Sequence, residues 1–111
     1  RAMGGVRSIG YGNVIANNYF FGVRGTGFSS ALCLVQGATA TQAGGVFVNG
    51  DDGNRYETAN HNWIFGNTFI DCAALHFSNS SGGNTPVHGT RFFNNLVAWT
   101  SAGVSSSGLL A

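Results

Sequence analysis

Arg55 and Tyr56 stand side by side in the segment GNRYETAN, and this pair has the most suggestive chemistry in the 111-residue chain. An arginine presents a planar fork of N–H donors that suits a carboxylate, and a neighbouring aromatic ring can stack on a sugar ring. The pair is therefore a candidate for binding an anionic sugar. A salt bridge between Arg55 and Glu57 within one loop is the alternative, and the sequence leaves both open.

Acid–base and metal chemistry have little support. The chain has four acidic residues and no lysine, and the adjacent Asp51 and Asp52 would point apart in an extended backbone. Two carboxyl groups facing one bond, as a glycoside hydrolase needs, are not expected. The stretch NGDDGN could bind calcium, but a solvated turn is the preferred interpretation. No Cys-x-x-Cys pair supports structural zinc. We expect no catalytic residue and no metal ligand in this chain.

Three similar segments would have to position any binding residues. Each is a short apolar strand, then Asn, then a second short strand: VIANNYF at 14–20, WIFGNTF at 63–69 and RFFNNLV at 91–97. A second element alternates apolar and polar residues at 6–8, 32–34, 75–77 and 104–106. Repeats of about 20 to 50 residues made of such short strands indicate stacked coils. The chain is predicted to be all-β, a partial right-handed parallel β-helix over 1–111 of about three coils, with a loop insertion at about 37–60.

Asn18, Asn67 and Asn95 share one column of the aligned segments. Asparagine tolerates the left-handed backbone conformation of a sharp bend, and stacked asparagine amides hydrogen-bond in a ladder. We therefore interpret this column as scaffold rather than as an active site.

The alternation of side chains along a strand assigns two faces to the second element. One column is expected to point outward, and a second outward column lies beside it. The first contains Arg7, Cys33, His76 and Ser105, and the second contains Ile9, Val35, Ser78 and Ser107. Arg7 and His76 are candidate binding residues, although a solvated polar side chain is the simpler interpretation of His76.

The two cysteines, Cys33 and Cys72, are predicted to be thiols. The register separates them by about four residues along the strands, roughly 13 Å, and by one coil. A disulfide needs Cα atoms within about 7 Å. Cys72 is expected to fill a small space in the core.

Charge and hydropathy exclude some partners. The net charge is +1 and only 8% of residues are charged, so neither nucleic acid nor a membrane is an expected partner. No apolar run approaches the roughly 18 residues of a membrane span. Because the chain begins at Arg1, we expect it to be cut from a longer parent protein.

In this register the chain resembles the second half of the catalytic β-helix of polysaccharide lyase family 6, which contains alginate lyases and chondroitinase B. The resemblance rests on four segments in this order: GGVRSIGYGNVIANNYFFG, SSALCLVQG, GNRYETANHNWIFGNTFIDCAALHF and RFFNNLVAW. It implies that the parent is a lyase cleaving a uronic-acid polysaccharide by β-elimination. Alginate is expected first as the substrate, with a glycosaminoglycan as the other candidate.

The resemblance also implies what this chain lacks. Family members use a Lys and an Arg for catalysis, and many bind Ca²⁺ beside the sugar carboxylate. The arginine's column holds Ile9, Val35 and Ser78 here, and the lysine and the calcium ligands have no counterpart. The chain alone is therefore expected to be inactive, to supply scaffold and part of the substrate groove, and to come from a secreted or periplasmic protein. Its expected groove contacts are Arg7, Arg55, Tyr56 and His76.

A non-catalytic β-helix, such as an adhesin or a phage spike, is the competing interpretation. A strand like LTLRHG upstream, with a preceding Lys and Glu pair, would favour the lyase.

Overall fold

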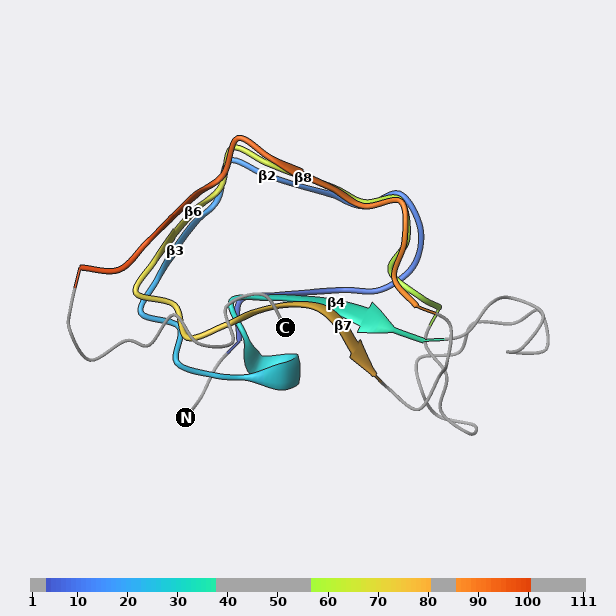
Figure 1. Cartoon of the computed structure of the whole chain (residues 1–111), viewed down its shortest axis with the longest axis horizontal. Helices are drawn as coiled ribbons and strands as arrows, with labels where there is room; N and C mark the ends of the chain where they lie inside the picture. The colour runs from blue at the N-terminus through green and yellow to red at the C-terminus, as the bar shows by residue number, and fades with distance from the viewer. Residues whose placement is uncertain (1–3, 38–56, 81–85, 101–111) are drawn as a thin grey trace.

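The structure, a computed structural model, describes residues 4–37, 57–80 and 86–100, with the side chains of 78–80 left out. These residues form three coils (Figure 1). The first coil contains β1 (Val6–Ser8), β2 (Val14–Ala16) and β3 (Tyr19–Phe21); the second contains β4 (Leu32–Gln36), β5 (Trp63–Phe65) and β6 (Thr68–Ile70); the third contains β7 (Leu75–Ser80), β8 (Arg91–Phe93) and β9 (Leu96–Ala98). A short 3-10 helix, η1 (Gly27–Ser29), joins the first coil to the second.

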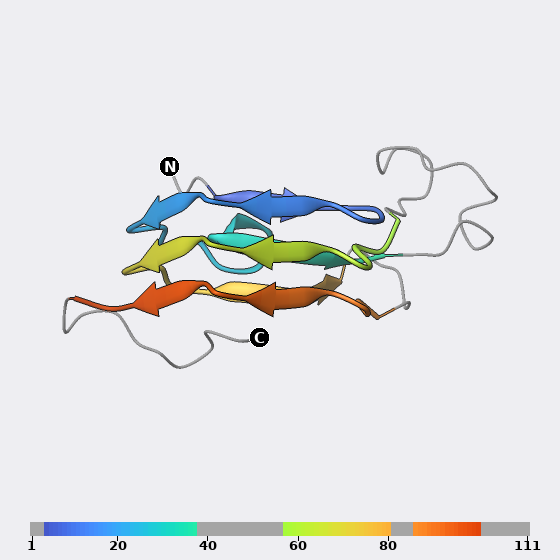
Figure 2. The same cartoon turned by 90° about the horizontal axis from the view of Figure 1, so that it is seen from above.

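Corresponding strands of successive coils pair in parallel and form three sheets, with strand orders β1-β4-β7, β2-β5-β8 and β3-β6-β9. Figure 2 shows the coils lying one above another, and the two views together show that the chain winds in the right-handed sense. The three aligned segments pair in the predicted register, with Val14 beside Trp63 and Trp63 beside Arg91. The predicted right-handed parallel β-helix is confirmed.

The predicted asparagine column forms a hydrogen-bonded ladder at the bend between the second and third sheets. The Oδ1 of Asn67 accepts from the backbone N–H and the side-chain amide of Asn18, at 3.0 and 2.9 Å. The Oδ1 of Asn95 accepts the same two bonds from Asn67, both at 3.0 Å. The left-handed conformation belongs to the preceding residue in each coil: Asn17 (φ 58°), Gly66 (φ 65°) and Asn94 (φ 52°). The ladder and the bend thus use two adjacent positions.

A second polar stack, which the sequence analysis did not identify, holds the bend before β2, β5 and β8. The backbone N–H of Asn13 donates to Oδ1 of Asn62 at 3.0 Å, and the amide of Asn62 donates to the hydroxyl of Thr90 at 3.5 Å. Asn62 is fully buried. Buried amides with partners on both sides fix the vertical spacing of the coils, because leaving one unpaired would be costly.

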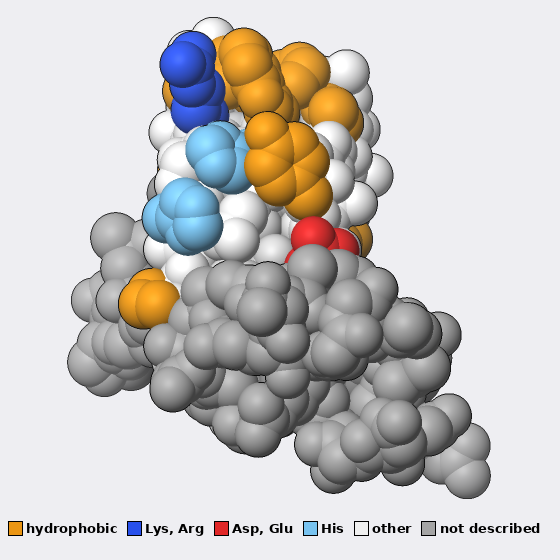
Figure 3. Space-filling model, turned by 90° about the vertical axis from the view of Figure 1, so that its right-hand side faces the viewer, with side chains coloured by type: hydrophobic (Ala, Val, Ile, Leu, Met, Phe, Trp, Pro, Cys, Tyr) orange, Lys and Arg blue, Asp and Glu red, His pale blue; other side chains and the backbone are white. Residues whose placement is uncertain are grey.

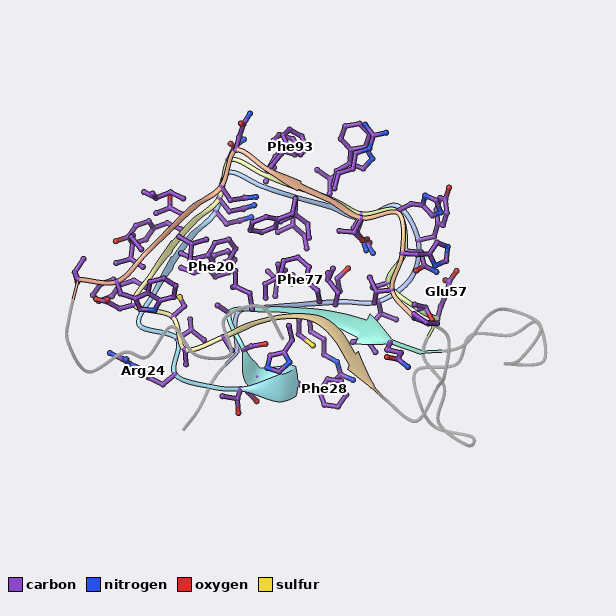
Figure 4. The ribbon with its side chains drawn as sticks, viewed as in Figure 1. Phe20, Arg24, Phe28, Glu57, Phe77 and Phe93 are labelled. Atoms are coloured by element: carbon purple, nitrogen blue, oxygen red, sulfur yellow. The ribbon has the colours of Figure 1, made fainter. Side chains whose placement is uncertain are left out.

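The interior is filled by apolar side chains from all three sheets, including Ile15, Leu32, Ile64, Phe69 and Leu75. The rings of Phe20 and Phe69 stack, with centroids 4.7 Å apart and planes 4° from parallel. Figure 4 shows Phe20 and Phe77 pointing into the interior and Phe93 pointing out of it. Leu32, Leu34 and Leu75 are fully buried, and Phe77 packs against this core, as predicted.

Both ends of the expected insertion already belong to the coil. The backbone N–H of Ala59 donates to the carbonyl of Val35 at 3.0 Å, and that of Gly37 donates to the hydroxyl of Thr58 at 3.1 Å. Residues 38–56, between these ends, lie outside the described residues, as does the fourth copy at 104–106. Among the described residues, no helix has the length and apolar character needed to cross a membrane.

Candidate substrate-binding face

The outer face of the sheet β1-β4-β7 carries the first predicted column. Arg7 pairs with Cys33, and Cys33 pairs with His76, so the three side chains stand side by side on neighbouring coils. Their strands form because apolar residues alternate with them and point into the core. This column is confirmed for the three residues, and Ser105 lies outside the described residues.

The segment that contains η1 packs over this face, against β4 and β7. A Cβ atom at Gly25 would lie 2.1 Å from the carbonyl oxygen of Ser29, so this tight turn requires glycine. The cover makes Cys33 fully buried although its side chain is on the outer face of the sheet. Cys33 thus lies on the outer face of the sheet, as predicted, but it is not exposed, because both faces of β4 are covered at this point.

His76 is half-buried beneath this cover. Its Nε2 accepts a hydrogen bond of 3.2 Å from the backbone N–H of Gly27, which requires that this nitrogen carry no proton. The histidine helps to hold η1 in place, and a contact to substrate remains a prediction.

Arg7 is exposed beside the cover, and its guanidinium carbon lies 4.4 Å from the centre of the Phe28 ring. Figure 4 shows Phe28 on the outer side of the sheet, away from the core. A guanidinium stacked on a ring keeps N–H donors at its edges, which suit a carboxylate. Of the two predicted contacts that the structure describes, Arg7 is exposed and His76 is half-buried, and a contact from Arg7 to a sugar remains a prediction.

The second predicted column is wrong in its register. Cys33 pairs with His76, but Val35 pairs with Asn79 instead of Ser78. One extra residue in β7 bulges between these pairs, and a bulge shifts every following side chain. Val35 is also fully buried, and Ser107 lies outside the described residues. Arg55 and Tyr56, the pair with which the sequence analysis began, lie outside them as well.

Neither cysteine is in a disulfide, as predicted. Cys72 is 1% exposed and packs in the core. Burial raises the pKa of the Cys72 thiol, and nearby Asp71 acts in the same direction, against hydrogen bonding from the backbone and the charge of Arg24. A buried, protonated thiol of this kind is inert, so Cys72 is a core residue rather than a nucleophile.

Among the described residues, no three His, Cys, Asp or Glu side chains lie close enough together to hold a metal ion. Binding of an anion through Arg7 on the outer face of β1-β4-β7 remains a prediction.

The sequence analysis missed a second face, on the sheet β2-β5-β8. There Trp63, Arg91 and Tyr11 line an open concavity. The alignment already placed Val14, Trp63 and Arg91 in one column, and reading that column outward would have identified the face.

The model of the chondroitinase B family matches residues 1–95. No curated protein and no solved structure gives a significant match. The family match spans most of the chain, and it agrees with the parallel β-helix and with the predicted likeness to polysaccharide lyase family 6. The chain therefore belongs to the chondroitinase B family, within polysaccharide lyase family 6.

Proposed function

We propose that this chain forms part of the β-helix of a polysaccharide lyase that cleaves a uronic-acid polysaccharide by β-elimination. Its contribution is scaffold together with part of the substrate groove. The match of residues 1–95 to the chondroitinase B family is the observation that carries the proposal. The same match supports a sulfated glycosaminoglycan as the substrate ahead of alginate, which reverses the order expected from the sequence.

Arg7 is the described residue best suited to the groove role. Abstraction of the proton next to a uronate carboxylate builds negative charge on that group, so the groove must hold anions firmly and in a fixed position. The guanidinium carbon of Arg7 lies 4.4 Å from the centre of the Phe28 ring, and this exposed arginine is proposed to bind one anionic group of the polymer. We assign no proton transfer to this residue, because an arginine side chain stays charged in proteins.

Three further parts of the proposal concern the parent protein. Arg55, Tyr56 and His76 are proposed as additional groove contacts. The Ca²⁺ that many relatives use would be bound by residues outside this chain. Because polysaccharides of this kind are extracellular, a secreted or periplasmic location follows from the substrate.

The test is the absorbance of the unsaturated uronate product formed by the parent enzyme with dermatan sulfate and with alginate. Product from dermatan sulfate is expected. Arg7→Ala should raise KM by roughly tenfold or more, the value of one charge-assisted contact, with little change in kcat. The matched control is Arg24→Ala, which also removes an exposed arginine. Product from alginate alone would overturn the substrate class, and equal KM values for the two variants would remove Arg7 from the groove.

A further inference from the structure

A second face combines aromatic rings with a cation. It lies on the outer side of β2-β5-β8 and the bend before it, and we call it the β5 face. Its open concavity of about 810 Å³ is lined by residues that include Tyr11, Val14, His61, Trp63, Gly89 and Arg91. Figure 3 faces the bend before β2, β5 and β8 and shows Arg, His and hydrophobic side chains close together in its upper part.

The stacking of the coils creates this face from residues far apart in the sequence. Val14, Trp63 and Arg91 are neighbours because β2, β5 and β8 pair in register, each about 4.8 Å from the next. At the preceding bend, Gly89 has φ +65°, and a Cβ atom there would lie 2.6 Å from Nδ1 of His61. Glycine at this point thus lets the third coil pass close beneath the His61 ring.

The Trp63 ring restricts the position of the Arg91 guanidinium. The guanidinium carbon lies 4.9 Å from the centre of the Trp63 ring system, and the arginine is exposed. A guanidinium over an aromatic face keeps N–H groups at its edges, and a carboxylate or sulfate can accept hydrogen bonds from such groups. None of the described residues that line the concavity is acidic.

Tyr11 supplies a ring for a sugar. It is 68% exposed, and its ring lies 4.9 Å from that of His61, tilted by 40°. His61 in turn contacts His88 edge to face, with centroids 5.2 Å apart. The Tyr11 ring is therefore supported from one side and open on the other, which is the arrangement that lets a pyranose pack on an aromatic side chain.

Cross-strand aromatic pairs also occur on sheets simply because they stabilise them. Packing alone does not explain why the rings stay open: Trp63 is 44% exposed and borders a concavity that also contains a cation. A concave site with a few convergent polar groups among apolar ones is the usual form of a ligand site.

We propose that the β5 face is a second binding site for an anionic polysaccharide, distinct from the outer face of β1-β4-β7. Arg91 binds a carboxylate or sulfate, and Tyr11 packs on an adjacent sugar ring. A polymer held at two faces of one β-helix dissociates more slowly than a polymer held at one, since the second contact is intramolecular. The identity of the polymer rests on the proposed function, whereas the binding itself does not.

Binding is measured directly by calorimetry, with the purified chain and dermatan sulfate oligosaccharides of defined length. Arg91→Ala should raise Kd by roughly tenfold or more, as expected for loss of one charge-assisted contact. Tyr11→Ala should raise it several-fold. The matched controls, Arg24→Ala and Tyr19→Ala, remove an exposed arginine and an equally exposed tyrosine elsewhere, and should leave Kd within about twofold of the unmodified chain.

Two further measurements identify the chemistry. Raising the ionic strength from about 0.01 M to about 0.15 M shortens the Debye length from about 30 Å to about 8 Å. This change should weaken oligosaccharide binding by the unmodified chain more than binding by the Arg91→Ala variant. A neutral dextran oligosaccharide of the same length should bind at least tenfold more weakly; equal binding would overturn the anionic class.

The outcomes separate this inference from the proposed lyase function. A Kd unchanged in Arg91→Ala but raised in Arg7→Ala would overturn the second site and leave the groove in place. Absence of binding by the unmodified chain, in a sample whose circular dichroism shows a folded β structure, would also overturn the second site. The lyase function is tested separately, by product formation in the parent enzyme.

Discussion

Replacing Asn67 by alanine removes the central rung of the asparagine ladder. Its side chain is 1% exposed and makes five hydrogen bonds. Two are accepted from Asn18; the amide donates to the carbonyl of Ile15 at 2.8 Å, to that of Phe65 at 3.1 Å and to Oδ1 of Asn95 at 3.0 Å. At roughly 0.5–1.5 kcal/mol net per bond, the simple sum is about 2.5–7.5 kcal/mol. Because bonds that share one amide are not additive, we expect a loss of about 3–4 kcal/mol.

The matched variant is Asn18→Ala, at the exposed end of the same ladder. Among the described residues its side chain makes two bonds, to the carbonyl of Ala16 and to Oδ1 of Asn67, and water can replace both. Its backbone N–H keeps its bond to Asn67, so the loss should be about 1 kcal/mol or less. A third variant, Asn67→Asp, keeps the acceptor but places an oxygen against the three oxygens that accept from the Asn67 amide. It should lose less stability at pH 4 than at pH 7, since protonation restores one donor.

The assay is urea unfolding of the purified chain, followed by circular dichroism and tryptophan fluorescence. If Asn67→Ala costs less than 1 kcal/mol, or no more than Asn18→Ala, the ladder does not stabilise the coils and the argument fails. If Asn67→Ala does not fold at all, the pH dependence of Asn67→Asp still tests the donor argument. A pH-independent loss in that variant would refute it.

Three other predictions follow from the structure and the family. Because burial raises the pKa of the Cys72 thiol, the folded chain keeps a proton that the unfolded chain releases above about pH 8.5. Above that pH the free energy of unfolding is therefore expected to fall, by at most about 1.4 kcal/mol per pH unit, and Cys72→Ala should flatten this slope in urea unfolding. In the parent enzyme, Arg55→Ala should raise KM by roughly tenfold with a smaller effect on kcat, and an unchanged KM would return Arg55 to a salt bridge with Glu57. The chain alone should form no unsaturated product from alginate or dermatan sulfate, and product that disappears in His76→Ala would contradict the inactive-fragment interpretation.

The fold could be predicted because its signals are local and repeated. Each coil carries the same short strands, and the asparagine at one bend recurs at Asn18, Asn67 and Asn95. A hydrogen-bonded stack needs the same residue type in each coil, so the stack is visible as a column in the alignment. The second stack was missed because its members differ: Asn13, Asn62 and Thr90 share hydrogen-bonding ability rather than identity.

The errors at the candidate site have a different origin. Because of the bulge in β7, Val35 pairs with Asn79 instead of Ser78. Nothing in the alternation of LHFSNS indicates which residue is extra. Cys33 is buried because the segment GTGFSS packs over it. A turn sequence predicts that the chain bends, but it does not predict which face of the sheet the following segment covers. Local pattern therefore predicted the direction of Arg7, Cys33 and His76, while long-range packing decided their exposure.

The proposed binding faces depend on the asparagine ladder. Asn67 and Asn95 join the second coil to the third directly after β5 and β8, the strands that carry Trp63 and Arg91. The 4.9 Å contact between the Trp63 ring and the Arg91 guanidinium exists only while those strands stay in register. A one-residue slip would turn every side chain of β8 to the opposite face and send Arg91 toward the core. The repeated asparagine is thus scaffold, and its contribution to binding is to keep an outward column outward.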